Sequence, residues 1–250
     1  MRRDDDTPLT CVSWNVHRGR GRDGIVDPSR TLDVLLEDVC PSAPDVLCLQ
    51  EADEEVRPHR GLLDLARLER EAGVTHAHPG AAARWSDESH GFLGVVLFLG
   101  PSVRLESLVL LDLPGHCHRG AVVADVACRG SHLRLIGTHL SLSQPLRVAQ
   151  MRTIGQHLAR RAPRQTILCG DLNEWRPWGG LALSERVLGL RLAGPARPTF
   201  PSGRPVLSLD RIMTSAPGRV AELRVLDSPG IRQASDHRPI AGRVLLGNRP

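Results

Sequence analysis

The sequence contains no lysine and no tyrosine, and its few aromatic residues supply only 3% of the 250 positions. All 32 basic side chains are therefore arginines, and they are spread along the chain without forming one dense basic block. A preference for arginine over lysine throughout a chain is typical of genome composition, although arginine also suits bidentate contact with phosphate. With so few stacking aromatics, the net charge of +4 gives little support for a polynucleotide-binding track.

The CxxC pairs of zinc and redox sites are also missing, although the chain has six cysteines, at positions 11, 40, 48, 117, 128 and 169. Three of them lie inside apolar segments, so we interpret the cysteines as small buried hydrophobic residues. We expect neither a disulfide framework nor a zinc site. The run His116-Cys117-His118 could bind a soft metal, but such a run arises far more often by coincidence in a loop.

Long hydrophobic runs are absent as well. No segment approaches the ~20 apolar residues that cross a bilayer, so we expect no membrane span. The first six residues are mostly charged and lack the apolar centre of a secretory signal, which predicts a cytoplasmic protein. No linker rich in glycine, serine or proline divides the chain. We expect a flexible N-terminus over residues 1–8, a single domain over residues 9–247, and a monomer.

The 41% of hydrophobic residues follow patterns typical of alternating strands and helices. Asp27 followed by Pro28 is a typical helix start, and apolar residues with helical spacing continue it to residue 39. Further helices are predicted over residues 61–71, 145–162 and 181–188. A meander of strands is predicted over residues 94–99, 105–111, 121–127 and 133–138. The helices carry apolar residues on one side only and alternate with strands. This pattern predicts an α/β (α+β) protein, a four-layer α-β-β-α sandwich of two packed mixed sheets with outer helices.

The most informative feature is that polar residues of similar chemistry meet six apolar runs. Residues 167–170 run into Asp171 and Asn173, and alternate residues of a strand share a face, so these two side chains point the same way. A single strand end of this kind is as typical of an ordinary turn as of a functional site. Recurrence favours one shared site, and the residues at the six runs are Asn15, Glu51, His139, Asp171 with Asn173, Asp210, and Asp236 with His237.

Short blocks around these residues resemble the signature segments of the endonuclease/exonuclease/phosphatase superfamily, the deoxyribonuclease-I-like phosphoesterases. Any single block is weak, but six in order from residue 13 to residue 239 are specific and span nearly the whole chain. The blocks are Ser13-Trp14-Asn15, Gln50-Glu51, Gly137-Thr138-His139-Leu140, Gly170-Asp171-Leu172-Asn173, Ser208-Leu209-Asp210-Arg211-Ile212 and Ser235-Asp236-His237-Arg238-Pro239. The resemblance implies the same four-layer fold and a hydrolase of phosphoester bonds.

A divalent cation is implied both by the resemblance and by the residue types. Mg²⁺ and Mn²⁺ prefer carboxylate, carbonyl and water ligands. Glu51, directly after Gln50, is the expected direct ligand. Asn15 and Asp236 are expected to complete the shell, directly or through water.

Five further residues take catalytic roles by the resemblance. Asp171 would position the attacking water, and Asn173 would hold the phosphate or the water. His237 would contact the phosphate, and Asp210 would accept its other N–H and fix its orientation. His139 would donate to a nonbridging oxygen or assist the leaving group.

The resemblance is imperfect near residues 91–97, where Val95 stands in place of an asparagine common in the family. The carboxylate that often steadies the first histidine is also not evident there, and Glu88 is a candidate for it. Arg18 and Arg147 are candidates for phosphate contact, with surface or helix-face roles equally open.

The substrate stays open among small phosphoesters, lipid head groups and nucleic acids, because one fold serves many reactions. Phosphodiesterase and phosphatase activities both remain possible readings, and a DNA endonuclease or exonuclease is the alternative within the family. A catalytically inactive phosphate-binding module is a third hypothesis, disfavoured because all eight expected site residues are present. The dispersed arginines favour a small or flexible phosphoester over long duplex DNA.

Overall fold

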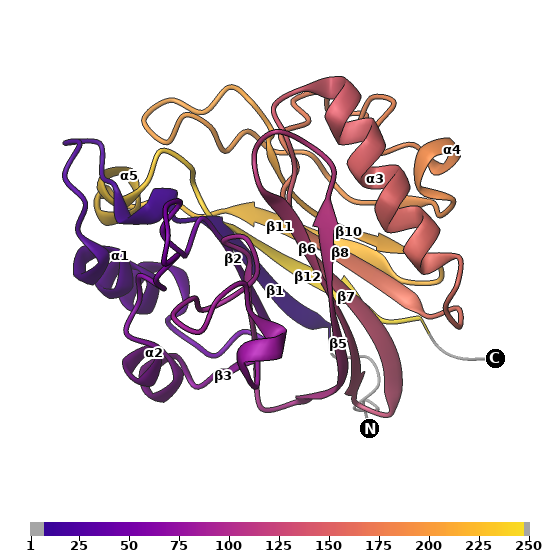
Figure 1. Cartoon of the computed structure of the whole chain (residues 1–250), viewed down its shortest axis with the longest axis horizontal. Helices are drawn as coiled ribbons and strands as arrows, with labels where there is room; N and C mark the ends of the chain where they lie inside the picture. The colour runs from indigo at the N-terminus through magenta and orange to yellow at the C-terminus, as the bar shows by residue number, and fades with distance from the viewer. Residues whose placement is uncertain (1–7, 248–250) are drawn as a thin grey trace.

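A computed structural model describes residues 8–247 of the chain. Its strands form two six-stranded sheets packed face to face, with helices on both outer surfaces (Figure 1). This arrangement confirms the four-layer α-β-β-α sandwich predicted from the sequence. The flexible N-terminus was predicted over residues 1–8, and all of that segment except Pro8 lies outside the described residues.

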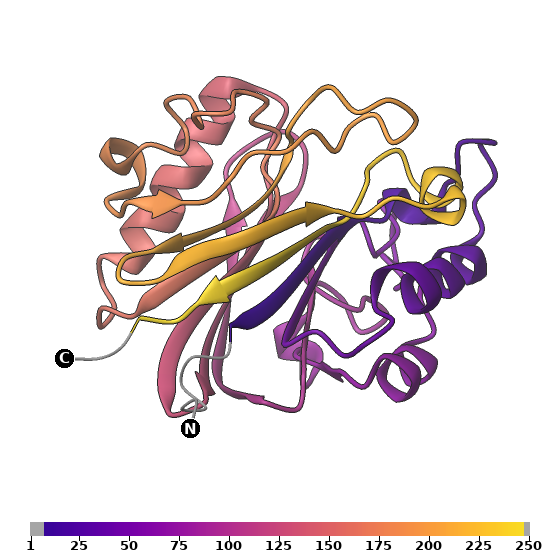
Figure 2. The ribbon, with the colours of Figure 1, turned by 180° about the vertical axis from the view of Figure 1, so that it is seen from behind.

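The first sheet has the strand order β11-β12-β1-β2-β4-β3. Its strands are Arg219–Val225 (β11), Ile240–Leu245 (β12), Leu9–Asn15 (β1), Val46–Gln50 (β2), Val96–Leu99 (β4) and Thr75–His76 (β3). Only β1 and β2 are parallel in this sheet; the other neighbours are antiparallel. Figure 2 shows β12 beside β1, so opposite ends of the chain are paired at the centre of one sheet.

The second sheet has the strand order β5-β6-β7-β8-β10-β9. Its strands are Val103–Leu113 (β5), Arg119–Cys128 (β6), Ser131–His139 (β7), Gln165–Asp171 (β8), Asp210–Ser215 (β10) and Leu192–Ala193 (β9). Here β7 and β8 form the parallel pair, and the remaining pairs are antiparallel. Each sheet is therefore mixed, with one parallel pair inside it.

Helices cover the outer face of each sheet. The first sheet is covered by α1 (Pro28–Val34), which continues as a π turn over Leu35–Val39, by α2 (Leu65–Ala72) and by α5 (Pro229–Ala234). The second sheet is covered by α3 (Gln144–Leu158) and α4 (Glu185–Leu188). Single 3₁₀ turns occur at His17–Gly19 and Ala81–Ala83. No helix within residues 8–247 has both the length and the apolar character needed to cross a bilayer.

Three apolar layers hold these elements together. The layer between the sheets contains Cys11, Cys48 and Cys169, which pack as the small hydrophobic residues predicted from the sequence. A second layer lies between the first sheet and α1, α2 and α5, with Trp14 and Phe98 as its large side chains. A third layer lies between the second sheet and α3 and α4. The central strands β1, β2, β7, β8 and β10 are buried over most of their length, so they lack a polar face, whereas the edge strands β5 and β11 are partly exposed.

The predicted start of α1 was right, whereas that of α2 was wrong although Asp64 caps it by accepting from the N–H of Arg67 at 3.0 Å. Asp27 caps α1 by accepting from the N–H of Arg30 at 3.0 Å, and Pro28 occupies its first turn. The helix predicted over residues 61–71 begins only at Leu65, because residues 61 and 62 donate backbone hydrogen bonds to Glu88 and Ala52. The helices predicted over 145–162 and 181–188 are also shorter than expected, at Gln144–Leu158 and Glu185–Leu188.

Two histidines, His76 and His78, pack under the edge of the first sheet. His78 Nδ1 donates to the Ala83 carbonyl at 2.7 Å, and its Nε2 accepts from the N–H of Leu97 at 3.2 Å. The His76 ring stacks on His78 with the centroids 5.1 Å apart. Burial lowers the pKa of each histidine to about 4, so both are neutral in the folded protein at pH 7.

We predict that the protein loses stability when the pH falls from 7 to 5. Between about pH 6.5 and pH 4 the unfolded chain binds protons at these histidines that the folded protein does not bind, so stability falls as the pH falls. Replacing His78→Gln should remove on the order of 1 kcal/mol of this pH-dependent loss. Urea denaturation at both pH values measures it.

The control for this prediction is Phe98→Leu, which alters packing against His76 without removing a titrating group. This variant should be destabilised by the same amount at both pH values. A pH dependence in His78→Gln equal to that of the wild type would contradict the role given to His78.

Candidate active site

The candidate site lies at the carboxyl ends of the two parallel strand pairs. Asn15 ends β1 and Glu51 follows β2, and the register pairs Asn15 with Gln50. His139 ends β7 and Asp171 ends β8, and these two residues are paired directly. The carboxyl ends of neighbouring parallel strands meet at one edge, which explains why residues from four distant segments converge.

A glycine lets β8 approach β7 immediately before the site. Gly170 has φ +149°, and a Cβ at this position would lie 1.9 Å from the Thr138 carbonyl oxygen. A larger residue would force the two strands apart. The block Gly170-Asp171 is therefore a packing requirement as well as a chemical one.

Antiparallel strands bring the remaining site residues to the same edge. Asp210 begins β10 and is paired with Asp171 of β8. His237 precedes β12, and its segment is fixed to β1 by two bonds: Trp14 Nε1 donates to the His237 carbonyl at 3.0 Å, and Ser235 Oγ donates to the Asn15 carbonyl at 2.7 Å. The sequence blocks from both ends of the chain are thus joined in space.

The carboxylate of Asp171 is the centre of the site and is 1% exposed. Its Oδ2 accepts from Asn15 Nδ2 at 3.1 Å and lies 3.4 Å from His139 Nε2 and 3.7 Å from His237 Nε2. Burial, reinforced by the charge of Asp210 and opposed by that of His237, raises the pKa of Asp171 to about 6. A carboxylate with this raised proton affinity is suited to act as a general base.

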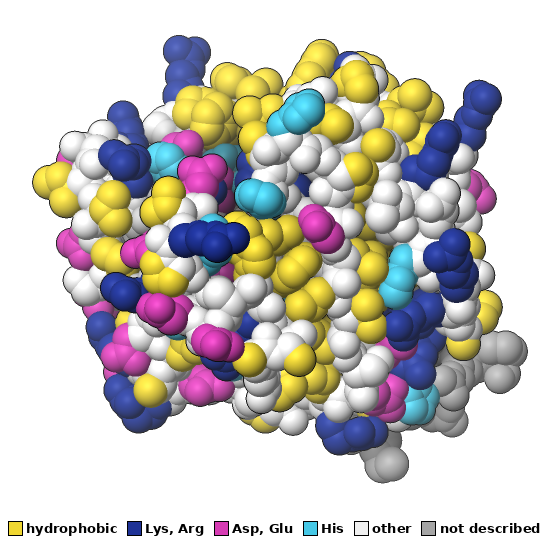
Figure 3. Space-filling view, viewed as in Figure 1, with side chains coloured by type: hydrophobic (Ala, Val, Ile, Leu, Met, Phe, Trp, Pro, Cys, Tyr) yellow, Lys and Arg dark blue, Asp and Glu magenta, His cyan; other side chains and the backbone are white. Residues whose placement is uncertain are grey.

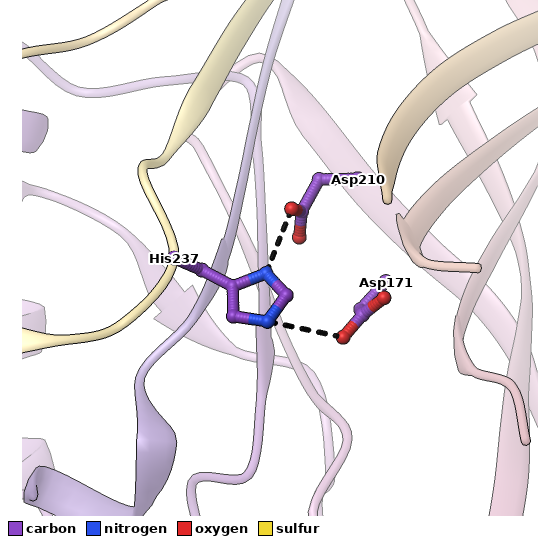
Figure 4. Close-up of side chains that lie close together, drawn as sticks. All are labelled: Asp171, Asp210 and His237. Carbon is purple, nitrogen blue, oxygen red and sulfur yellow. Dashed lines mark hydrogen bonds and ion pairs between the residues drawn. The ribbon is translucent and has the colours of Figure 1, made fainter. Parts of the chain in front are cut away.

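His237 lies between two carboxylates, with one ring nitrogen toward each (Figure 4). Its Nδ1 donates to Asp210 Oδ2 at 2.9 Å, and Thr199 Oγ1 donates to the same oxygen at 2.5 Å. Burial alone would lower the pKa of His237, but the charges of Asp210, Asp171 and Asp236 outweigh burial and raise it to about 10. His237 is therefore an imidazolium at neutral pH and has an N–H available for an anionic oxygen.

His139 has the opposite electrostatic character. It is fully buried, and its Nδ1 lies 3.9 Å from Glu51 Oε1, while its Nε2 lies 3.3 Å from Asn173 Nδ2. Burial, together with the positive charges of Arg119, His237 and Arg18, lowers the pKa of His139 well below 6.5. The site thus holds one neutral and one charged histidine on either side of Asp171.

The three residues predicted as metal ligands carry the side-chain oxygens that a hard divalent cation prefers. Asn15 Nδ2 lies 3.5 Å from Glu51 Oε1, so the two side chains are neighbours. Asp236 Oδ1 is a buried atom without a hydrogen-bond donor, and only His17 Nδ1, at 3.5 Å, lies near it. Buried oxygens seldom lack a partner, so this orphaned carboxylate oxygen suits a hard cation such as Mg²⁺ or Mn²⁺. The residues predicted as metal ligands therefore fit such an ion.

Asp171, Asp210 and His237 also offer ligand atoms within 4.8 Å of one another, and no other such His, Cys, Asp or Glu group occurs in residues 8–247. A protonated imidazole cannot ligate a cation, because its lone pair is occupied. The His237–Asp210 hydrogen bond also uses one carboxylate oxygen. We therefore interpret these three residues as proton-transfer and phosphate-binding groups and not as the metal site.

Four residues around the site have left-handed backbone conformations. The φ angles are 47° at His17, 50° at Arg18, 56° at Glu51 and 50° at Asn173. Such conformations cost of order 1–3 kcal/mol each in residues with a side chain and concentrate where function requires an unusual side-chain direction. Glu51 comes directly after β2, and Asn173 comes two residues after the end of β8. In these two residues the unusual backbone conformation accompanies side chains that lie beside Asn15 and His139.

Sequence patterns missed two neighbours of the site. Arg119, at the start of β6, is half-buried and forms no ion pair or side-chain hydrogen bond with any residue in the described range 8–247, although its charge acts on His139. His17 contacts Asp236. A free cation beside a candidate phosphate site is a strong signal in a structure, but nothing in the local sequence distinguishes Arg119 from the other arginines.

Arg18, Arg147 and Glu88, the three further candidates from the sequence, each have a partner in the structure. Arg18 donates to Glu51 Oε2 at 2.6 Å and so balances a predicted metal ligand. Arg147 is buried and donates to the Ser141 and Leu142 carbonyls, which gives it a structural role in the loop after β7. Glu88 pairs with Arg60 at 3.1 Å and not with His139. The carboxylate that pairs with His139 Nδ1 is instead that of Glu51, at 3.9 Å.

Solved structures with the same fold have low sequence identity to the chain. An endonuclease/exonuclease/phosphatase from Beutenbergia cavernae is 20% identical, with a TM-score of 0.65 over 98% of this chain and 73% of that one. TDP2 from D. rerio, solved with a single-strand DNA product, is 21% identical, with a TM-score of 0.66 over 96% and 99%. A mannosyl-6-phosphatase from Bacteroides thetaiotaomicron is 16% identical, with a TM-score of 0.66 over 95% and 100%.

A search of curated protein sequences finds no significant match. A family model does match, and it covers residues 12–237, which include all eight residues of the candidate site. Since this range is most of the chain, and since the strand ends bring the matching blocks to one edge, the protein belongs to the endonuclease/exonuclease/phosphatase family.

Proposed function

We propose that the protein is a divalent-metal-dependent hydrolase of phosphoester bonds. The observation that carries the proposal is the buried trio of Asp171, His237 and Asp210, in which a carboxylate of raised pKa lies beside an imidazolium held by a second carboxylate. A buried base and a buried cation within 3.7 Å suit attack of water on an anionic ester.

Glu51, Asn15 and Asp236 are the proposed ligands of Mg²⁺ or Mn²⁺. When bound, the ion supplies charge neutralisation for the phosphate oxygens and favours ionisation of water. Arg18 donates a hydrogen bond to one oxygen of the Glu51 carboxylate and so holds this carboxylate in position. Arg119 is the proposed contact for a further phosphate oxygen, because its guanidinium has no other partner within residues 8–247.

The proposed proton transfers use only side chains of this chain. Asp171 accepts a proton from the attacking water, which Asn173 helps to orient; the Asn173 N–H is itself fixed to Asp171 Oδ1 at 3.0 Å. His237 donates its Nε2–H to a nonbridging oxygen as negative charge grows, while Asp210 keeps the ring in one orientation. His139, which is neutral, donates a hydrogen bond to the phosphate or to the leaving oxygen without adding charge to the site.

We predict that hydrolysis requires Mg²⁺ or Mn²⁺ and that Glu51→Gln weakens metal binding. The neutral amide removes the only charge of the pair Glu51 and Asn15. The affinity for Mn²⁺, measured by calorimetry, should therefore fall by at least tenfold, because loss of even an outer-shell partner of a metal typically costs about 10–100-fold. The matched control is Glu55→Gln, since Glu55 also faces Arg18, at 3.7 Å, but is 73% exposed. Full activity after exhaustive chelation would refute the metal requirement.

Asp171→Asn tests the general base separately. The amide can keep the contact with Asn15 but cannot accept a proton, so turnover in a single-turnover assay should fall on the order of 10²–10⁴-fold while Mn²⁺ still binds. Asp33→Asn, the same substitution at an ion pair with Arg67 on the surface, is the control and should retain wild-type turnover. Near-normal turnover by a folded Asp171→Asn variant would remove Asp171 from this role.

The His237–Asp210 pair is tested by a double-mutant cycle. His237→Ala and Asp210→Ala should each reduce turnover severely, and the double variant should lose little more than the worse single variant, because residues that act as a unit are non-additive. Thr199→Val is a useful third variant, since it removes only the second donor to Asp210. Multiplicative losses in the cycle would show that the two residues act independently.

A further inference from the structure

A cavity of about 160 Å³ opens beside the proposed metal and phosphate position. Glu51 and His139 form its inner wall, so a group bound there would lie directly next to the reacting phosphate. The remaining walls come from the turn after β1, which supplies Arg18, and from three loops, those after β2, before β4, and between β5 and β6. Of these outer side chains, only Arg18 and Arg119 have a role in the function proposed above. Figure 3 shows histidines and carboxylates gathered at the upper left of this face.

One wall of the cavity is aromatic. The Trp85 indole lines the cavity and is backed by His59, with the ring centroids 3.4 Å apart and the planes 18° from parallel. His118 lies on the β5–β6 side, 5.3 Å from Trp85 and inclined by 52°. Trp85 is therefore held rigidly between two loops. A rigid indole offers an apolar surface to the C–H face of a saturated ring at low entropic cost.

Among the Asp, Glu and Arg side chains that line the cavity, two lack partners. Glu54 and Arg119 are both half-buried cavity residues, and within residues 8–247 neither side chain forms a hydrogen bond or an ion pair. A carboxylate accepts hydrogen bonds from hydroxyl groups, and a guanidinium donates hydrogen bonds to them. Hydroxyl groups can do both. A purely hydrocarbon group would instead bury two charges without compensation, which is costly.

The volume limits the size of the occupant. A cavity of ~150 Å³ holds one benzene-sized ring, whereas sites for drug-sized ligands measure ~300–1,000 Å³. One six-membered ring therefore fills the space, and a base pair or a dinucleotide exceeds it. A second phosphate in this position would meet Glu54 as well as Arg119, so a neutral ring fits better than an anionic one.

We propose that this cavity binds the alcohol part of the substrate and that this part is a single hydroxyl-bearing ring, as in a monosaccharide or cyclic polyol phosphate. The inference rests on the proposed phosphoesterase function, because it takes the ring to be the group esterified to the reacting phosphate. Trp85 packs against the C–H face of the ring, Glu54 accepts from one hydroxyl, and Arg119 donates to an oxygen between ring and phosphate.

The test compares kcat/KM, with Mn²⁺ present, for glucose 6-phosphate, inositol 1-phosphate, glycerol 3-phosphate, ethyl phosphate and adenosine 5′-monophosphate, each as the monoester and as its methyl diester. The wild type should prefer the two ring polyols over ethyl phosphate by at least about tenfold, the scale on which a shaped pocket discriminates. Equal kcat/KM for all esters, or a preference for the nucleotide, overturns the inference and leaves the phosphoesterase proposal standing.

Variants assign the preference to the cavity. Trp85→Ala and Glu54→Gln should each lower the ratio of kcat/KM for glucose 6-phosphate over ethyl phosphate by about tenfold. Glu54→Gln removes only a charge and so keeps the test decisive if loss of Trp85 disturbs folding. The matched control is Trp178→Ala, since Trp178 is 76% exposed and lies outside the cavity; its ratio should equal the wild-type value. An unchanged ratio in Glu54→Gln and in folded Trp85→Ala contradicts the inference.

Calorimetry separates the two proposals. If no ester is hydrolysed with Mg²⁺ or Mn²⁺, the proposed function fails. Titration of the intact protein with glucose 6-phosphate then tests separately whether the cavity binds the ring. Binding that is at least tenfold weaker in Glu54→Gln supports the ring subsite. No binding by the wild type, or equal binding by the variant, overturns it.

Discussion

The structure depends on one electrostatic constraint, the burial of the Asp171 carboxylate. A buried carboxylate without partners is unstable in its charged form, so donors must surround it. Asn15 comes from the other sheet, and His139 and His237 come from two further segments. Two sheets whose strand ends coincide satisfy this requirement. The face-to-face packing is therefore the arrangement that keeps a charged base stable inside the protein, as well as the source of the inter-sheet core.

The same geometry gives the two histidines different protonation states. Burial, with the positive charges of Arg119, His237 and Arg18 added to it, lowers the pKa of His139 and keeps it neutral, whereas the carboxylates around His237 outweigh burial, raise its pKa and keep it charged. The difference arises from position, because the intrinsic chemistry of the two rings is identical. A site that needs a cation for a phosphate oxygen and a neutral donor elsewhere can obtain both from histidine if burial dominates at one ring and neighbouring carboxylates dominate at the other.

Much of the fold and most of the site could be predicted because their signals are local. An apolar run followed by Asp171 or His139 identifies both a buried strand and the end at which the candidate site lies, and Asp27 with Pro28 marks a helix start. What could not be predicted depends on distant contacts. Residues 61 and 62 stay outside α2 because their N–H groups bond to other loops, although Asp64 marks the helix start locally. The importance of Arg119 follows from a missing partner, which no sequence window records.

Chemistry and recognition occupy different parts of this framework. The proposed catalytic and metal-binding residues lie at or next to strand ends, and the sheet register pairs Asn15 with Gln50, Asp210 with Asp171 and His139 with Asp171. Trp85 and Glu54 instead lie on loops, which can change length and sequence without altering the register. A fold built in this way can keep one mechanism of ester hydrolysis while the loops select the alcohol. The cavity is therefore lined largely by loop side chains, whereas Asp171, Asp210 and His237 are positioned at or next to strand ends.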